Sequence, residues 1–119
     1  MITVTDATFA DAVLACDVPV ALDFWAQWCP PCHAIGRTLA ELEPEFAGRL
    51  VFAKINSDEN PMATRTYRVM SLPTLIVFSR GNVIVAQVGS RPKSHLREMF
   101  EAALDKAGVG AAVSQRPQR

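Results

Sequence analysis

The sequence predicts a three-layer α/β protein, in which helices cover both faces of a central five-stranded mixed sheet. Two apolar runs, at 18–25 and 50–55, are rich in β-branched and aromatic residues and too short for typical helices. Between the predicted strands lie segments whose apolar residues have helical spacing. A helix between two strands acts as a crossover connection, so the first three strands should be parallel. The predicted element order is βαβαβαββα.

A short strand and a helix are expected before the first long apolar run. Residues 2–4 form a short apolar piece, and residues 7–15 place apolar side chains at helical spacing. Asp6 stands just ahead of that segment and is expected to cap it. The run at 18–25 then follows as a central strand covered on both faces.

The longest helix is expected at 29–47. Its apolar positions repeat every three or four residues, and Gly48 stands just past its end. After the strand at 50–55 comes a short helix at 61–67, which Asn60 precedes and which begins with Pro61, a residue favoured at the first helical position.

The last part of the chain predicts a β-hairpin and a helix. Two strands at 73–79 and 82–88 flank a tight turn that contains Gly81. The final helix is expected to begin near Pro92 and to end at Gly108. The hairpin should lie antiparallel beside the parallel strands.

Length and composition exclude several classes of protein. The chain has 119 residues, half of them hydrophobic, which predicts one domain at 1–108 and a flexible tail at 109–119. Twelve basic and twelve acidic side chains give a net charge of zero, which disfavours binding to nucleic acid or to anionic membranes. No signal segment opens the chain, and no apolar run reaches roughly 18 residues. We expect a cytoplasmic monomer.

The motif WCPPC carries the candidate chemistry. Cys29 falls where a strand gives way to a helix, and Pro30 suits the first helical position because its missing N–H would be unsatisfied anyway. The free N–H groups and the helix dipole favour an anion there, so the pKa of the Cys29 thiol should fall. Cys32 lies one turn later, within reach of the same sulfur. The pattern predicts thiol–disulfide exchange, in which Cys29 attacks and Cys32 resolves.

Two charged residues lie within the apolar strands. Asp23 is the only charged residue of its strand, and burial should raise the pKa of its carboxyl group toward neutrality. Lys54 lies in the neighbouring apolar strand, where it either extends its stem to solvent from the strand end or takes part in the site. If these strands are adjacent, Asp23, Lys54 and Cys32 form one proton-handling cluster, with Asp23 as the base for Cys32.

The structural alternatives for the cysteine pair are a structural disulfide and half of a zinc site. Zinc needs four ligands, and the remaining candidates, Cys16, His33 and His95, form no second pair at finger spacing. We therefore expect no metal and no bound cofactor. Cys16 is expected to be a small buried residue at a helix end and His95 a surface residue, whereas His33 is either an exposed first-turn residue or a charge that tunes the neighbouring thiolate.

The chain resembles the thioredoxin family. The resemblance rests on FWAQWCPPC with Asp23 two residues before Trp25, on AKIN at 53–56, DENP at 58–61 and LPTL at 72–75, and on the Val88-Gly89 pair. It covers about residues 2–108 without a large insertion. The resemblance implies the thioredoxin fold and a protein-disulfide reductase in which Cys29 and Cys32 are redox-active.

The resemblance also implies partners and further site residues. Electrons would come from an NADPH-dependent flavoprotein, a thioredoxin reductase, and would pass to disulfide-containing client proteins. Asp23 would be buried with Lys54, and the peptide bond between Leu72 and Pro73 would be cis. The implied groove for an extended client segment consists of seven residues beside the cysteines: Trp28, Pro30, Pro31, Leu72, Pro73, Val88 and Gly89.

Four residues depart from the family's usual pattern. Pro30 stands where Cys-Gly-Pro-Cys is usual, which stiffens the loop, so we expect a redox potential different from the family norm. Arg37 stands where the long helix commonly carries proline, which predicts a straighter helix or one bent at Gly36. Ser57 and Arg68 stand where apolar or small residues are usual near the groove, and they are expected to alter the choice of clients.

Three other functions stay open at this point. A glutaredoxin-like activity is one, because Cys-Pro-x-Cys occurs there, although the strand and helix ahead of the motif and Trp28 argue against it. A strongly oxidising potential would indicate an oxidase or isomerase instead. An interaction module in which redox cycling is incidental is the third.

Overall fold

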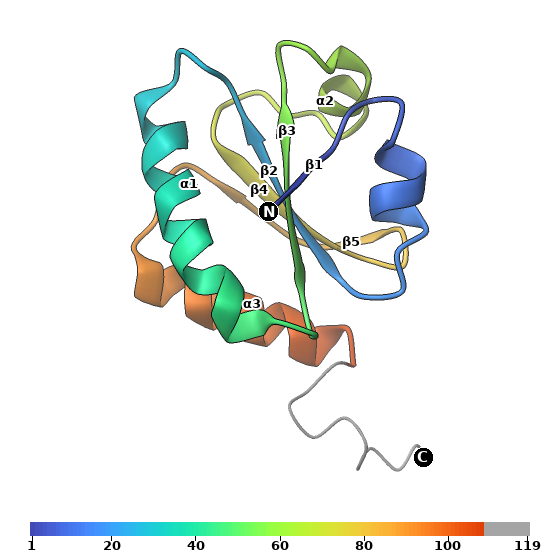
Figure 1. The fold of residues 1–119 in the computed structure, drawn as a ribbon, viewed down its shortest axis with the longest axis vertical. Helices are drawn as coiled ribbons and strands as arrows, with labels where there is room; N and C mark the ends of the chain where they lie inside the picture. The colour runs from blue at the N-terminus through green and yellow to red at the C-terminus, as the bar shows by residue number, and fades with distance from the viewer. Residues whose placement is uncertain (109–119) are drawn as a thin grey trace.

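The computed structural model describes residues 1–108, which form a five-stranded sheet with helices on both sides (Figure 1). The elements in chain order are β1 (Ile2–Thr3), η1 (Ala10–Leu14), β2 (Val20–Trp25), α1 (Pro30–Leu42), η2 (Glu43–Phe46), β3 (Val51–Asn56), α2 (Pro61–Thr66), β4 (Thr74–Ser79), β5 (Asn82–Val88) and α3 (Lys93–Lys106). This confirms the predicted order. The predicted tail at 109–119 lies outside the described residues, and the domain boundary at residue 108 stays a prediction.

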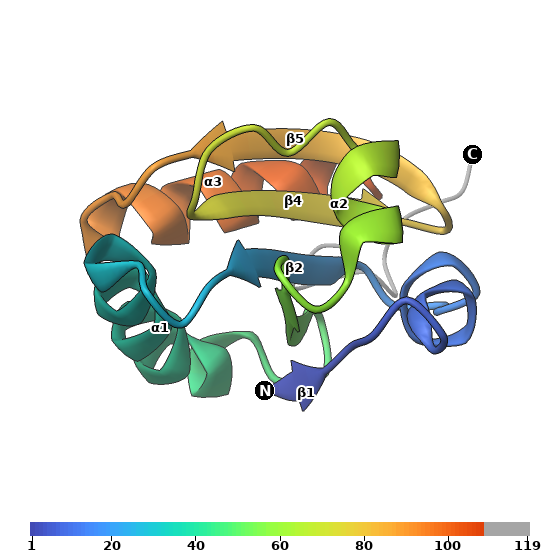
Figure 2. The same cartoon turned by 90° about the horizontal axis from the view of Figure 1, so that it is seen from above.

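The sheet has the strand order β1-β3-β2-β4-β5. β1, β3 and β2 are parallel, while β4 pairs antiparallel with both β2 and β5, as the crossover argument predicts. β2 lies in the middle, which explains its continuous apolar run. α1 and α3 cover one face of the sheet, and η1 and α2 cover the other (Figures 1 and 2). The three-layer architecture is therefore confirmed.

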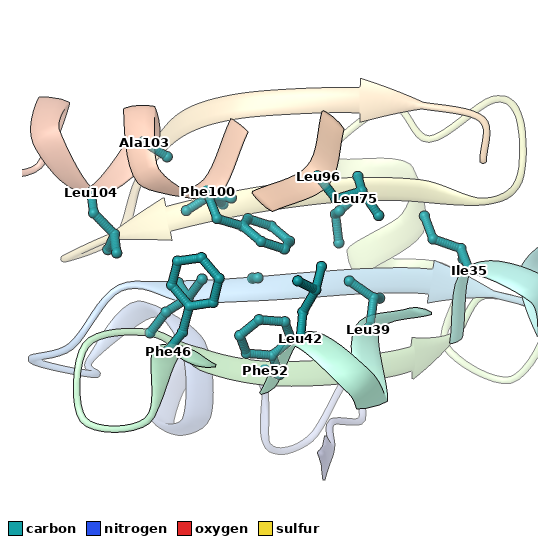
Figure 3. Packing of buried hydrophobic residues seen from close by; sticks show 13 residues of the cluster. Ile35, Leu39, Leu42, Phe46, Phe52, Leu75, Leu96, Phe100, Ala103 and Leu104 are labelled. Carbon is teal, nitrogen blue, oxygen red and sulfur yellow. The ribbon is translucent and has the colours of Figure 1, made fainter. Parts of the chain in front are cut away.

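The larger core cluster lies between the sheet and the pair α1 and α3 (Figure 3). Its centre is three phenylalanine rings from three different elements. The ring centroids of Phe46 and Phe100 lie 5.6 Å apart, and those of Phe52 and Phe100 lie 5.3 Å apart, both edge to face. Such pairs add to the stabilisation that burial provides. Other side chains that point into this cluster in Figure 3 are Ile35, Leu39, Leu42, Leu75, Leu96, Ala103 and Leu104.

The prediction of one continuous helix over 29–47 was wrong. α1 ends at Leu42, and the next four residues form a 3₁₀ turn, η2. Pro44 has no N–H and cannot donate to the carbonyl of Ala40, so the α-helical ladder stops there. Phe46 is nevertheless buried, and Gly48 adopts a φ of +83° just after the turn.

The prediction that Asp6 caps a helix at 7–15 was also wrong. That segment forms only one π-helical turn, η1, which has no side-chain cap. The Asp6 carboxylate instead accepts the backbone N–H groups of Met62 at 3.0 Å and Ala63 at 2.9 Å, so it caps α2. The Asp6 N–H donates to Asn60 Oδ1 at 2.8 Å. A residue far away in the sequence therefore supplies the cap.

The hairpin and the last helix agree with the sequence. Arg80 and Gly81 have φ values of +50° and +85°, the signs that a two-residue primed turn requires at both positions. Pro92 immediately precedes α3, and Gly108 follows it with a φ of +80°. Within residues 1–108, none of the helices has the length and apolar character that crossing a membrane requires.

Candidate active site

Cys29 and Cys32 form a disulfide at the amino terminus of α1, with their Cα atoms 5.2 Å apart. Cys29 is the residue that caps the helix, in an extended conformation, and Pro30 is its first residue. The Cys32 N–H donates to Cys29 Sγ at 3.2 Å. The predicted position of Cys29 at the cap is confirmed. Its sulfur lies where free N–H groups and the helix dipole stabilise negative charge.

The loop before the helix holds Cys29 against the end of β2. After Trp25 the chain turns, and the Cys29 N–H donates to the carbonyl of Ala26 at 3.2 Å. Ala26 is fully buried, and the two cysteines pack with it in a small cluster that Leu72 also contacts. Both cysteines are nearly buried, at 3% and 2% exposure. Only a limited part of the disulfide therefore faces solvent.

Asp23 lies in the middle of β2, where it is 2% exposed. Its Oδ1 atom is buried without a hydrogen-bond partner. Burial raises the pKa of the Asp23 carboxyl group from its ordinary 3.8 to about 7, and the positive charge of Lys54 offsets part of that rise. At neutral pH the carboxyl group is thus close to half ionised, as a group that exchanges protons requires.

Lys54 is the direct neighbour of Asp23 in the parallel pairing of β2 with β3. Its side chain is partly buried, and the ammonium lies over the Trp25 ring, 5.7 Å from the centroid. Among residues 1–108, the ion pairs within 4.0 Å do not include one between Asp23 and Lys54. Lys54 therefore acts on Asp23 through its electric field rather than through a direct bond.

An open cavity of about 440 Å³ joins these groups. Asp23, Lys54 and Cys32 all line it, so the structure brings together the three residues that the sequence analysis grouped. Gly36 and Arg37 from α1 also line it, and sequence reasoning did not include them in the site. Their position one turn after Cys32 on the same helix was the only available signal.

Trp28 is exposed beside the disulfide, with 67% of its surface accessible. Its Nε1–H donates to Asp58 Oδ2 at 2.8 Å, which fixes the direction of the indole ring. Asp58 follows β3, and sequence reasoning did not assign it a role. Pro30 and Pro31 are also exposed. An oriented aromatic surface therefore lies next to the cysteines.

The opposite rim comes from the segments around β4 and β5. The peptide bond between Leu72 and Pro73 is cis, and Pro73 accepts the Gly89 N–H at 2.8 Å. Leu72 packs against the cysteine cluster, and Val88 is 52% exposed. Gly89 adopts a φ of +90°, which favours glycine. Of the groove residues that the resemblance implied, Leu72 thus contacts the cysteines, and Pro73, Val88 and Gly89 lie at the adjoining ends of β4 and β5.

The remaining cysteine and histidines lie in different surroundings. His33 is exposed, but its Nε2 lies 2.8 Å from the carbonyl oxygen of Gln27, and its ring packs edge-on to Trp25. Cys16 is a free, partly buried cysteine that packs against the cluster under η1 and α2. His95 lies at the surface, 3.2 Å from Gln87 Oε1. Residues 1–108 contain no group of three or more candidate ligands for a metal ion.

Ser57 and Arg68, the two residues expected to alter the choice of clients, lie in different surroundings. Ser57 is 9% exposed, and its Oγ atom has no hydrogen-bond partner, whereas its N–H donates to the carbonyl of Trp25 at 2.8 Å. Arg68 is exposed and has a φ of +54°. Ser57, the residue after β3, therefore has a second buried oxygen without a hydrogen-bond partner.

Comparison with known proteins identifies the family. The thioredoxin family model matches residues 1–102. A thioredoxin of Haemophilus influenzae is 44% identical over 93 residues, which are 78% of this chain and 87% of that protein. Thioredoxin 1 of a Nostoc species is 41% identical over 98 residues (82% and 92%), and a thioredoxin of Pseudomonas aeruginosa is 41% identical over 102 residues (86% and 94%). The chain belongs to the thioredoxin family and is a thioredoxin-like protein-disulfide reductase with a Cys29–Cys32 redox pair.

Proposed function

We propose that the chain reduces client disulfides with Cys29 as the attacking thiol and Cys32 as the resolving thiol. The observation that carries this assignment is the position of Cys29 Sγ at the start of α1, where it accepts the Cys32 N–H at 3.2 Å. That environment stabilises a thiolate, which is the nucleophile in disulfide exchange. Cys32 lies inside the first helical turn, where its sulfur is bonded to that of Cys29.

The reaction transfers two electrons from the dithiol to the client. The Cys29 thiolate attacks one sulfur of the client disulfide, which forms a mixed disulfide and releases the other client sulfur as a thiolate. The Cys32 thiol then loses its proton and attacks Cys29 Sγ. This step closes the Cys29–Cys32 bond and releases the second client sulfur. The client gains two thiols, and the chain is left as the disulfide.

Asp23 is the proposed acceptor of the Cys32 proton. Both residues line the same cavity, and the pKa of about 7 lets the carboxyl group take up and release a proton near neutrality. Lys54 is the proposed partner that keeps the Asp23 pKa from rising further, because its positive charge favours the ionised carboxylate. The cavity has room for water between Asp23 and Cys32.

The proposed docking surface surrounds the disulfide. Trp28, Pro30 and Pro31 supply exposed apolar surface on the α1 side. Leu72, Pro73, Val88 and Gly89 form the other side, where the exposed Val88 and the cysteine-contacting Leu72 support a role in binding an extended client segment. Apolar contact suits a chain with zero net charge.

We further propose that the chain works as a cytoplasmic monomer that a thioredoxin reductase recharges. An NADPH-dependent flavoprotein of that class would return two electrons to the Cys29–Cys32 disulfide after each cycle. The domain is proposed to span residues 1–108. Family membership supports the reductase partner, and the three-cysteine composition supports a reducing compartment.

The test is reduction of insulin disulfides with NADPH and thioredoxin reductase as the electron source. We expect turnover by the parent protein and a loss of at least about a thousandfold in Cys29→Ser, because the nucleophile is gone. Cys32→Ser should instead accumulate a mixed disulfide with insulin, detectable by mass spectrometry. Cys16→Ser is the matched control and should keep parent activity. Trapping by Cys29→Ser but not by Cys32→Ser would reverse the two assigned roles, and equal trapping by both would contradict the assignment of a single attacking thiol.

Two further measurements separate the proposal from its alternatives. Faster turnover with glutathione and glutathione reductase than with thioredoxin reductase would indicate a glutaredoxin-like protein. Equilibration with dithiothreitol mixtures gives the redox potential, and a value close to that of strong oxidants would indicate an oxidase or isomerase. If Cys29→Ser failed to reduce insulin but kept the cellular role, the protein would be an interaction module.

A further inference from the structure

Gly36 lies in the interior of α1, where nothing about the helix requires a glycine. Its φ is not positive, unlike that of Gly48, Gly81, Gly89 and Gly108. A Cβ atom built on it would meet no atom within 4 Å, so close packing does not exclude a side chain. Glycine is less favourable than alanine in a helix interior. The absence of a large side chain at this position therefore needs another explanation.

The cavity beside the disulfide supplies that explanation. Gly36 and Ala40, one turn apart on α1, both line it. On the far side it reaches Asp23, which is 2% exposed and whose Oδ1 has no hydrogen-bond partner. The lining also includes the exposed residues His33 and Arg37, so the cavity opens to the surface. A side chain at position 36 would extend into the space between Asp23 and solvent.

We propose that the small size of Gly36 and Ala40 keeps open a water-filled passage through which Asp23 exchanges protons with solvent. A cavity of about 440 Å³ holds several waters, and Asp23 Oδ1 offers an unpaired acceptor for one of them. The passage rests on the proposed role of Asp23 as the acceptor of the Cys32 proton. After each cycle that proton must leave, and Asp23 itself is only 2% exposed.

Other charged groups face the same space from each surrounding element. Lys54 lines it from β3, and His33 and Arg37 line it from α1 beside the disulfide-bonded Cys32. Met1 lines it at the chain start, where its amino group pairs with Glu43 at 3.2 Å. None of them changes in the variants below, so a change in the titration of Asp23 reports on solvent access.

The first measurement is the pKa of the Asp23 carboxyl group by carbon-13 NMR in the disulfide form, which needs no turnover. In Gly36→Leu, the side chain should displace water and raise this pKa by about one, because desolvation disfavours the carboxylate. Gly36→Ala removes the glycine but leaves the space, so the Asp23 pKa should stay near that of the parent. Ala40→Leu should act in the same direction as Gly36→Leu, whereas Ala102→Leu, an identical change on the exposed side of α3, should not.

The second measurement is the rate at which Cys32 resolves a mixed disulfide between Cys29 and thionitrobenzoate. If the Asp23 pKa rises by about one, the ionised fraction at pH 7 falls from about a half to about a tenth, and resolution by Gly36→Leu should slow about fivefold. The difference should vanish above about pH 9. Alkylation of reduced Cys29 should keep its parent rate, since Gly36 does not line the surface at that sulfur.

The outcomes separate the passage from the role of Asp23. An Asp23 pKa that is the same in the parent, Gly36→Leu and Ala40→Leu would overturn the passage, whatever the kinetics. An equal rise in Gly36→Ala and Gly36→Leu would overturn it too, because backbone flexibility would then be the cause. If instead Asp23→Asn resolved the mixed disulfide at the parent rate at every pH, the proposed base role would fail, while the NMR titration would still decide the passage.

Discussion

The face of the sheet under α1 and α3 and the end of the sheet that carries Cys29 are built in opposite ways. On the covered face, large apolar side chains such as Phe46 and Phe100 are fully buried and pack edge to face (Figure 3). At the redox end, the buried Asp23 Oδ1 lacks a partner, and Trp28 is 67% exposed. The covered face is therefore closely packed, whereas the redox end leaves a buried polar atom unpaired and a large aromatic ring exposed.

The difference shows where the molecule gains stability and where it gains reactivity. An unpartnered buried carboxyl group costs folding free energy but gives a proton acceptor that titrates near neutrality. An exposed indole adds little to folding but provides surface for a client segment. The covered face offsets these costs, as is general for proteins whose active sites depart from good packing. Truncation of a side chain on the covered face should therefore lower the free energy of unfolding, whereas neutralising the buried carboxyl group at the redox end should raise it.

The largest effect on stability is expected from Phe100→Ala on the covered face. Its ring contacts both Phe46 and Phe52, so truncation leaves a cavity and should lower the free energy of unfolding by about 3–5 kcal/mol. Urea denaturation measures the loss. Val83→Ala, which truncates a half-exposed apolar residue of β5, is the control and should change stability by less than about 0.5 kcal/mol. A loss below about 1 kcal/mol for Phe100→Ala would mean that the covered face is not the main source of stability.

The second largest effect is expected at the redox end, and it has the opposite sign. Because the folded carboxyl of Asp23 has a pKa of about 7 against 3.8 ordinarily, the folded state holds its proton more tightly than the unfolded state does. The contribution of Asp23 to stability should therefore be highest below pH 4, fall as the pH rises from 4 to 7, and level off above that. The difference between the two pKa values corresponds to a loss of stability of roughly 4 kcal/mol at most.

Asp23→Asn removes the cost of ionising a buried carboxyl group, and it therefore tests whether the redox end lowers stability. At pH 8 the variant should be about 2–4 kcal/mol more stable than the parent, with the difference shrinking toward pH 4. Urea midpoints across this pH range measure it, and Asp105→Asn on the exposed side of α3 is the matched control. A variant that is less stable than the parent at pH 8 would contradict the assignment of a destabilising buried carboxylate.

The smallest effect is expected from Asp6→Ala. Asp6 caps α2 and binds Asn60, and so it fastens the loop that carries Asp58, the partner of Trp28. Loss of the cap should lower the free energy of unfolding by about 1 kcal/mol. Thermal unfolding measures this loss, and the exposed Asp17→Ala is the control. No loss for Asp6→Ala would mean that the loop at the redox end folds without that cap.

Local patterns in the sequence were enough to predict most of the architecture. Local signals predict the apolar runs of β2 and β3, the helical spacing in α1 and α3, and the turn at Gly81. Each signal lies within a few neighbouring residues. The cap position of Cys29 follows in the same way, because Pro30 can begin a helix but cannot continue one. The resemblance added the cis bond before Pro73, which periodicity does not reveal.

Only the tertiary structure decided which distant residues meet. Asp6 caps α2 rather than the nearby η1, and Asp58 orients Trp28 from 30 residues away. The cavity beside Asp23, with Gly36 at its wall, exists only once α1 has packed against the sheet. By itself the sequence determined the helices, the strands and the reactive motif, because backbone hydrogen bonding and amphipathic spacing are local. Caps, cavities and pKa values depend on contacts between residues that are far apart in the sequence, and long-range packing decides those contacts.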